Sequence, residues 1–252
     1  MSMVKILKIG GSVLTDKNRQ ACARTEEIER VAREAAASSS GLVIVHGAGS
    51  FGHIPAKKYG LPDRFDPDGL RETHASVVKL NELVVSARSR AGADPVPVHP
   101  LSCVLLRGGR IETLCFEPIL EMVKRGIVPV LHGDVAMDAL QGSGIVSGDQ
   151  LVSYLARALR SDVVAVGTDV DGVIFNGRVL PRVTREDLPR ITGSLGDSSG
   201  VDVTGGMKGK LLELLDLADA GTDSVIFNAR IEGRLEKVLK GESEGTKVGR
   251  TD

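Results

Sequence analysis

The sequence contains no tryptophan, and aromatic residues make up only 3% of its 252 residues. Proteins that bind single-stranded nucleic acid stack the bases on aromatic side chains, so this scarcity argues against that class. Charge of one sign is also lacking, because 32 Lys and Arg residues face 33 Asp and Glu residues. Without a strong positive field, we expect neither nucleic acid nor an anionic membrane as a partner.

Cysteines and long apolar runs are scarce too. Cys22, Cys103 and Cys115 lie far apart and form no C-x-x-C pair, which is typical of a reducing compartment. No run approaches the ~20 apolar residues of a membrane span, and Lys5 and Lys8 interrupt the stretch where a secretory signal would lie. The histidines show no H-x-x-x-H spacing. We therefore expect a cytoplasmic protein whose own residues hold no metal.

Short β-branched runs alternate with stretches whose apolar residues recur every three or four positions. This alternation predicts an α/β protein, a three-layer αβα sandwich on a mostly parallel central sheet. No repeat or linker divides the chain, so residues 1–252 are expected to form one domain. The predicted strands are residues 4–9, 42–45, 96–98, 104–106, 109–114, 127–131, 162–166, 224–227 and 246–248. The predicted helices are residues 25–37, 70–91, 116–125, 147–159, 207–220 and 235–239, and residues 54–69, rich in Pro and Gly, are predicted to be irregular.

Glycine is abundant, with 30 residues, and it clusters where predicted strands end. The carboxyl ends of parallel strands share one edge of a sheet, where ligands bind. Glycine lets backbone N–H groups come close to a bound anion, so several such loops on one edge predict an anion-binding pocket. The loops are residues 8–12, 46–53, 132–134 and 167–172.

Two common nucleotide-binding motifs fit these glycines poorly. The loop at 46–53 spells G-x-G-x-x-G, but it follows the second predicted strand rather than the first. The acidic residues about 20 positions further on fall in the segment predicted to be irregular. A Walker loop fails as well, because Leu211 follows Lys210 where that motif requires Ser or Thr.

Three lysines and one histidine near the loops are candidates for binding phosphate. Lys8 ends an apolar strand, where a buried charge is costly unless an anion pairs with it. Lys210 lies where a helix begins after glycines, a position suited to clamp phosphate; the alternative interpretation is a glycine-rich turn before a solvated helix. For Lys17 an ordinary surface lysine is an equally good interpretation. His53 ends a glycine loop, whereas His46 is expected to be a structural residue at a strand end.

The loops and lysines lie in motifs that resemble the amino acid kinase superfamily, and within it the isopentenyl phosphate kinases. The motifs stand in the family's order and span nearly the whole chain. His53 and the D-V-T-G-G-M block narrow the resemblance toward these kinases and the related fosfomycin kinases. The matching motifs are K-I-G-G-S at 8–12, H-G-A-G-S-F-G-H at 46–53, S-G-D at 147–149, G-T-D-V-D-G-V at 167–173 and D-V-T-G-G-M-x-G-K at 202–210.

The resemblance implies a kinase that uses ATP with Mg²⁺ to convert isopentenyl phosphate into isopentenyl diphosphate, in an alternative mevalonate route of isoprenoid biosynthesis. It also implies a homodimer, with acceptor binding mainly in the N-terminal part of the chain and ATP binding mainly in the C-terminal part. Ala48 departs from the glycine of many relatives, and His132 from a frequent tyrosine. Lys208 is a competing lysine beside Lys210, although only Lys210 fits the family's G-G-M-x-G-K position.

The resemblance further implies roles for single residues. Asp149 would orient Lys8 and Lys210, and Lys17 would stabilise the transferring phosphoryl group. The implied catalytic residues are Lys8, Lys17, His53, Asp149 and Lys210. The implied ATP-binding residues are Lys8, Gly10, Gly11, Ser12, Gly49, Thr168, Asp169, Ile174, Gly206 and Lys210, and the implied acceptor-binding residues are Ala48, Gly52, His53 and Gly148.

The type of acceptor decides whether a general base is needed. A phosphate, whose second pKa is about 6, is already largely ionised and needs none. An alcohol would need a carboxylate, for which Asp134 and Asp149 are the candidates. A fosfomycin or other small-acid kinase, and a nucleotide-binding protein without catalysis, remain alternatives. An isoprenoid tail would need an apolar slot, although core packing is the simpler interpretation of each residue that might line it: Val77, Leu80, Val84, Ile145 and Val146.

Overall fold

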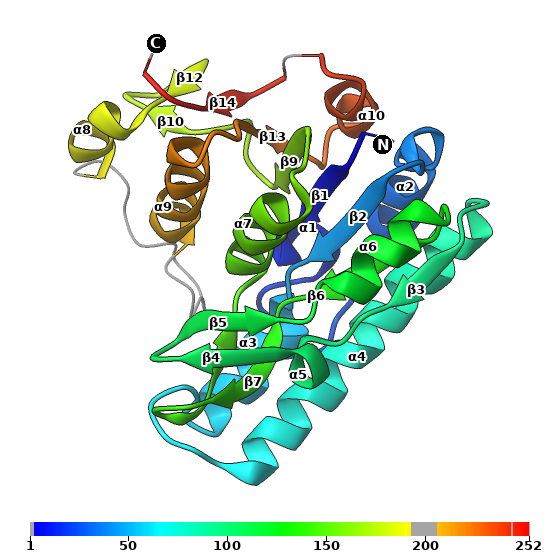
Figure 1. Ribbon diagram of the computed structural model, residues 1–252, viewed down its shortest axis with the longest axis vertical. Coiled ribbons are helices and arrows are strands. Elements are labelled where there is room, and N and C mark those ends of the chain that lie inside the picture. The colour runs from blue at the N-terminus through cyan, green and yellow to red at the C-terminus, as the bar shows by residue number, and fades with distance from the viewer. Residues whose placement is uncertain (1–2, 193–205, 243, 252) are drawn as a thin grey trace.

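The computed structural model describes residues 3–192, 206–242 and 244–251 (Figure 1). Its eight-stranded sheet has the order β12-β14-β13-β9-β1-β2-β6-β3. Neighbouring strands run parallel, except for the antiparallel pair of β13 and β14, which confirms the prediction of a mostly parallel sheet. The strands are β1 (Lys5–Ile9), β2 (Leu42–His46), β3 (Pro95–Pro97), β6 (Val128–His132), β9 (Val163–Thr168), β12 (Arg182–Val183), β13 (Ser224–Asn228) and β14 (Thr246–Val248).

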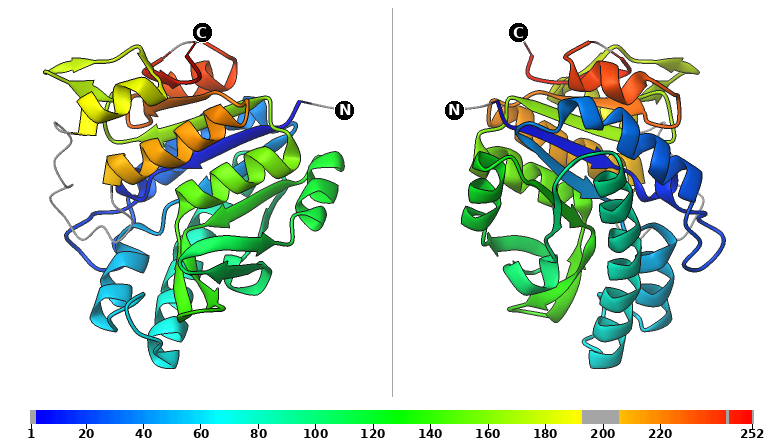
Figure 2. Two further views of the ribbon diagram at one scale, coloured as in Figure 1. Left: turned by 60° about the vertical axis from the view of Figure 1, so that its left-hand side comes forward. Right: turned by 90° about the vertical axis from the view of Figure 1, so that its right-hand side faces the viewer.

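Helices cover both faces of this sheet, so the predicted three layers are confirmed (Figure 2). Successive side chains of a strand point to opposite faces, and β1 shows the result. Ile6 packs in one core and Leu7 in the other. The helices on the Ile6 side are α6 (Glu117–Lys124), α7 (Gly148–Leu159) and α9 (Gly206–Asp219). Those on the Leu7 side are α2 (Thr25–Glu34), α4 (Pro67–Arg90) and α10 (Arg234–Leu239).

A second, four-stranded sheet, of order β5-β4-β7-β8, lies beside the carboxyl edge of the large one (Figure 1). The hairpin of β4 (Val104–Arg107) and β5 (Arg110–Leu114) was expected. The hairpin of β7 (Asp134–Asp138) and β8 (Gly142–Val146) was missed, because its glycines and aspartates interrupt the apolar alternation that marks a strand. The Asp138 carboxylate joins the two hairpins, accepting hydrogen bonds from the Gly108 and Gly109 amides at 3.1 and 2.7 Å.

The prediction that residues 54–69 are irregular is wrong for half of the segment. Helix α3 (Gly49–Lys58) continues through Pro55, and only residues 59–66 between it and α4 are irregular. The lost hydrogen bond at Pro55 is tolerated because α3 buries Phe51 and Ala56. Helix α4 begins at Pro67, a residue well suited to a first helical position, after Asp66 accepts a hydrogen bond from the Gly69 amide at 2.8 Å.

Shorter elements complete the description. No helix in the described ranges has the length and hydropathy to span a bilayer. The remaining helices are α1 (Gly11–Leu14), α5 (Pro100–Cys103), α8 (Leu188–Thr192) and the 3₁₀ turns η1 (Ala36–Ser38) and η2 (Arg185–Asp187). The remaining strands, β10 (Ile174–Phe175) and β11 (Arg178–Val179), form a small antiparallel pair.

The central strands β1, β2, β6 and β9 end side by side at one edge of the sheet. Ile9 is in register with His46 and with Gly167, and His46 with His132. The glycines after these ends extend the ladder by one more bond, since the amides of Gly10, Gly47 and Gly133 each donate at 2.8 Å to the neighbouring strand. The predicted glycine loops therefore meet at this carboxyl edge.

Candidate active site

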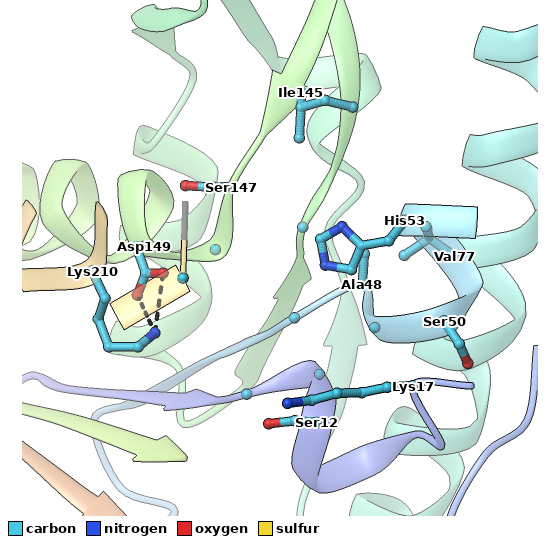
Figure 3. Close-up of a pocket in the computed structure, with 18 of the residues that line it drawn as sticks. Ser12, Lys17, Ala48, Ser50, His53, Val77, Ile145, Ser147, Asp149 and Lys210 are labelled. Atoms are coloured by element: carbon cyan, nitrogen blue, oxygen red, sulfur yellow. Dashed lines mark hydrogen bonds and ion pairs between the residues drawn. The ribbon is translucent and has the colours of Figure 1, made fainter. Parts of the chain in front are cut away.

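A cavity of about 330 Å³ opens at the carboxyl edge of the central strands, between the two sheets. The structure brings to its walls all the predicted site residues except Ile174. Ile174 lies on β10 and is exposed, outside the lining. In Figure 3, Lys210 and Asp149 stand at one end of the cavity, while His53, Val77 and Ile145 stand across from them.

Two glycine loops touch through their backbones on the floor of this cavity. A Cβ on Gly11 would lie 2.5 Å from the Gly49 nitrogen, and a Cβ on Gly47 would lie 2.5 Å from the Gly11 nitrogen. Gly49 has a φ of +51°, a conformation that glycine adopts at little cost. The hydroxyl of Thr15 joins the loops, donating to the Gly11 carbonyl at 2.8 Å and accepting from the Ser50 amide at 3.1 Å. No side chain fits between the loops, so glycine is required there.

Three buried charges form the centre of the site. The Lys8 ammonium lies 2.6 Å from an Asp149 carboxylate oxygen, and the Lys210 ammonium lies 3.1 Å from both oxygens. Asp149 stands in the first turn of α7, whose N-cap Ser147 accepts a hydrogen bond from the Gln150 amide at 3.1 Å. A carboxylate at a helix N-terminus is favoured by the helix dipole. Within the described residues, the ammonium groups of Lys8 and Lys210 thus share this one carboxylate.

The pKa values of Lys8 and Asp149 follow from their burial and from the sharing of one carboxylate by two ammonium groups. Lys8 is 5% exposed, and burial lowers the pKa of its ammonium group to about 7, although Asp149 opposes the shift. Burial alone would raise the pKa of Asp149, but the Lys210 and Lys8 ammonium groups outweigh it and hold that pKa at about 2. Asp149 therefore stays ionised and is a poor proton acceptor, whereas Lys8 gains from any phosphate that binds beside it.

Lys17 approaches the same cavity from the loop after α1. Its ammonium lies 3.4 Å from an Asp169 carboxylate oxygen, and more than half of its side chain is exposed. The Asp169 carboxylate also accepts from Ser12, and these partners lower its pKa despite partial burial, which acts the other way. Thr168, next along the chain, donates its hydroxyl hydrogen to the Val170 carbonyl at 2.9 Å. Lys17 is thus placed at the cavity rather than on a remote surface.

The structure separates the two competing lysines of α9. Lys210 reaches Asp149, while Lys208 is exposed and does not line the cavity. Residues two apart on a helix face different directions, so only one of them can point inward. The part of the matching motif at 202–205 lies outside the described residues.

The far end of the cavity is largely apolar. Val77, Ile145 and Val146 line it, as the slot hypothesis proposed, while Leu80 and Val84 belong to the core beneath. Three further lining residues, Ile54, Ala56 and Thr73, carry no local sequence signal, because no pattern indicates that α3 and α4 face the cavity. A ligand bound here would lie with its polar end near Lys8 and its apolar end among these side chains.

Asp134 and four of the five histidines form a network beside the apolar end. The Asp134 side chain is 0% exposed and lies 2.9 Å from the His74 ring nitrogen Nδ1. His99 contacts His132 at 2.9 Å, and the His132 and His46 rings stack with centroids 5.6 Å apart. The sequence indicates Asp134, His46 and His132 separately but does not predict that they meet, because the histidines come from four separate segments.

No group of three or more His, Cys, Asp or Glu side chains that could hold a metal ion occurs in the described ranges. The carboxylates that line the cavity there are Asp134, Asp149 and Asp169. Each already has partners: Asp149 has two lysines, Asp169 has Lys17, and Asp134 has His74 as well as the Val135 amide at 2.9 Å. The site can therefore bind and polarise phosphate groups, but its carboxylates are poorly placed to remove a proton.

Comparisons with known proteins agree with this chemistry. A model of the amino acid kinase family matches residues 3–228. The isopentenyl phosphate kinase of Methanocaldococcus jannaschii is 34% identical, over 98% of this chain and 98% of the relative. The one from Methanothermobacter thermautotrophicus is 38% identical, over 96% of this chain and 98% of the relative. A crystal structure of an isopentenyl phosphate kinase superposes with a TM-score of 0.85 at 34% identity, covering 97% of this chain and 99% of that chain.

The sequence match spans both the glycine loops and α9, and the structural match spans both sheets. A likeness of this extent fixes the fold and its chemistry as a kinase. The chain belongs to the amino acid kinase family, in the branch that contains the isopentenyl phosphate kinases.

Proposed function

We propose that the protein transfers the γ-phosphoryl group of ATP to isopentenyl phosphate and releases isopentenyl diphosphate and ADP. The single observation that carries this proposal is that the two ends of the cavity are lined by different kinds of group. One end holds lysines and glycine amides, the other holds apolar side chains, and its carboxylates are already engaged. Such a site suits an acceptor that is anionic at one end and apolar at the other.

The ionised acceptor oxygen would attack the γ-phosphorus directly, and the bond from the γ-phosphorus to the bridging oxygen of ATP would break. No general base is needed, since a phosphate monoester is already largely ionised near neutral pH, its second pKa being about 6. An alcohol acceptor would need Asp134 or Asp149 as the base. The engagement of both carboxylates disfavours that alternative.

The lysines would cancel the charge that spreads over the transferring phosphoryl group. Lys8 and Lys210 would contact the ATP phosphates, with Asp149 holding the two ammonium groups apart and in place. Lys17 would approach the γ-phosphoryl group from the opposite loop. The remaining predicted ATP ligands are the glycine loops and the β9 end: Gly10, Gly11, Ser12, Gly49, Gly206, Thr168 and Asp169, with Ile174 beyond the cavity.

The acceptor's phosphate would lie between α3 and α7. His53 points into the cavity from α3 and would donate a hydrogen bond to it, together with the amides of Ala48 and Gly148. Gly52 would line the wall beside this phosphate, since its own amide donates to the Ala48 carbonyl at 3.3 Å. The isoprenoid tail would then pack against Val77 and Ile145. Residues from the N-terminal part thus serve mainly the acceptor, within one domain of residues 1–252.

Mg²⁺ would enter with ATP, because the described residues offer no metal cage of their own. The ion would neutralise phosphate charge, and we assign no protein ligand to it. We further propose a cytoplasmic homodimer that serves an alternative mevalonate route, a proposal supported by its free cysteines and by the family resemblance. Light scattering in solution tests the dimer.

A panel of acceptors tests the proposal, with coupled detection of ADP. Isopentenyl phosphate should give the highest kcat/KM, ahead of fosfomycin, other phosphonates and N-acetylglutamate. Equal or better turnover of fosfomycin, or none with isopentenyl phosphate, would reject the assigned substrate. Binding of ATP by calorimetry without turnover of any acceptor would instead identify a non-catalytic nucleotide-binding protein.

A further inference from the structure

His46 is buried at the end of β2, directly before the loop that lines the acceptor end of the cavity. The histidine is not itself part of the cavity lining. Its ring lies between α4 and the loop backbone, with Nε2 at 3.0 Å from the Asn81 side-chain nitrogen and Nδ1 at 3.1 Å from the Gly47 carbonyl oxygen. The question is which nitrogen carries the proton.

The partners of Asn81 decide the orientation of its amide. Asn81 is fully buried on α4, and its nitrogen also lies 3.3 Å from the Val130 carbonyl, which can only accept a hydrogen bond. The Asn81 NH₂ group therefore donates to Val130 and, with its second hydrogen, to Nε2 of His46. Nε2 must then accept, so the proton of a neutral ring is on Nδ1.

The Nδ1–H group donates to the Gly47 carbonyl, which fixes the plane of the next peptide. In a trans peptide the N–H points opposite to the C=O, so the Ala48 N–H is turned away from the ring. The Gly47–Ala48 peptide is trans, because the cis bond of the described residues lies at Leu61–Pro62. Ala48 lines the cavity, at the place where the acceptor's phosphate is proposed to bind.

The neighbouring strand, β6, ends in a histidine whose two ring nitrogens have a similar arrangement of partners. His132, in register with His46, places Nδ1 at 3.2 Å from the Gly133 carbonyl and Nε2 at 2.9 Å from His99 Nδ1. The two buried rings stack on one another. Burial, with the His132 ring close by, lowers the pKa of His46 to about 3, so the ring stays neutral near pH 7.

We infer that His46 is a positioning residue for phosphoryl transfer: held in one tautomer by Asn81, it fixes the Gly47–Ala48 peptide so that the Ala48 amide is aimed at the acceptor's anionic group. His46 touches neither substrate and acts through the backbone. This inference rests on the proposed function only for the place of the acceptor, since the bonds of the ring do not depend on it.

Paired variants at His46 test the inference by steady-state kinetics. His46→Leu fills the space without a donor, and should raise the acceptor KM about tenfold while the ATP KM stays within about twofold, because one charge-assisted hydrogen bond is misdirected. His46→Asn carries an amide donor near the position of Nδ1 and should bring the acceptor KM back close to its wild-type value. The matched control Ser224→Ala removes a buried hydroxyl at the first residue of β13, on the edge of the sheet away from the cavity. It should change neither KM.

An unchanged acceptor KM in His46→Leu overturns the inference, as does an equal rise of both KM values without rescue by Asn. Should the Leu variant not fold, the wild-type ring still decides: long-range ¹H–¹⁵N correlation at pH 7 should show Nδ1 protonated, and a proton on Nε2 overturns the inference. The acceptor is whichever compound the wild type phosphorylates in the panel. Failure of isopentenyl phosphate therefore rejects the assigned substrate and leaves this test in force.

Discussion

The two ends of the cavity differ in the kind of group that lines them. At the proposed ATP end, the ammonium groups of Lys8 and Lys210 share the carboxylate of Asp149, and charged groups dominate. At the acceptor end, the groups are backbone amides, a histidine and apolar side chains such as Val77 and Ile145. On the proposed assignment, the first end would attract a polyanion through its ammonium groups, while the second end would recognise shape and a single anionic group.

On the proposed assignment, this difference separates the residues that promote phosphoryl transfer from the residues that select the acceptor. Phosphoryl transfer gains most from positive charge held in place, and that requirement is the same for any acceptor. The proposed acceptor end would supply the choice of substrate, because an apolar wall rejects polar tails through lost hydrogen bonds. Variants at the ATP end should therefore lower kcat, and variants at the acceptor end should raise the KM of the acceptor alone.

The largest effect is expected at Lys210. Lys210→Ala should lower kcat by about 10²-fold or more, because it removes the ammonium group that is proposed to stabilise transition-state charge. Steady-state kinetics with saturating ATP and acceptor measure it. Lys208→Ala is the matched control and should retain nearly full activity, since Lys208 is exposed. An unchanged kcat in Lys210→Ala would refute the role of this lysine.

His53 should show the opposite kinetic signature. His53→Ala should raise the acceptor KM about tenfold or more, since a hydrogen bond to a charged phosphate is lost, while ATP binding changes little. Calorimetry with an ATP analogue and steady-state kinetics with the acceptor measure the two effects separately. Equal weakening of both ligands would show that His53 is not confined to the acceptor end.

The apolar wall should set the size of the tail, with a smaller effect. Ile145→Ala removes three carbons from the lining and should lower kcat/KM for isopentenyl phosphate by up to about tenfold. The space gained should improve the relative use of a longer prenyl phosphate. Leu80→Ala is the control, since Leu80 lies in the core and should reduce stability without changing the preference for tail length.

The smallest effect is a proton taken up at the ATP end. Burial lowers the pKa of Lys8 to about 7, so at pH 8 much of this group is neutral in the free protein. Bound phosphates favour the ammonium form, so ATP binding at pH 8 should take up a fraction of one proton, and at pH 6 almost none. Calorimetry in buffers of different ionisation enthalpy measures this uptake. No uptake at pH 8 would show that Lys8 is already charged.

Much of the fold could be predicted from local pattern. The buried strands of the central sheet are short apolar runs, and their order along the chain, with helices between them, implies parallel pairing. The segment around Pro55 was misjudged because proline and glycine signal turns locally, while packing against the rest of the molecule keeps α3 helical. The β7–β8 hairpin was missed because its strands carry Asp and Gly.

In the site too, some features follow from local sequence pattern and others do not. Glycine loops and Lys8 stand in strong local patterns, so the sequence identified them. The contact of His74 with Asp134 joins residues 60 positions apart, and the His46–Asn81 contact joins residues 35 apart. No periodicity encodes such pairs, because they depend on where α4 crosses the ends of β2 and β6.

The sequence by itself determined which residues can carry phosphate chemistry: lysines and glycines at strand ends and at a helix start, where backbone amides can approach an anion and a buried cation can pair with it. Only the tertiary structure decided that Lys210 rather than Lys208 meets Asp149, that the carboxylates are engaged, and that α3, α4 and β8 supply an apolar wall. The physical reason is that local pattern sets the direction of a side chain within its element, whereas the neighbour it meets is set by the packing of elements distant in sequence.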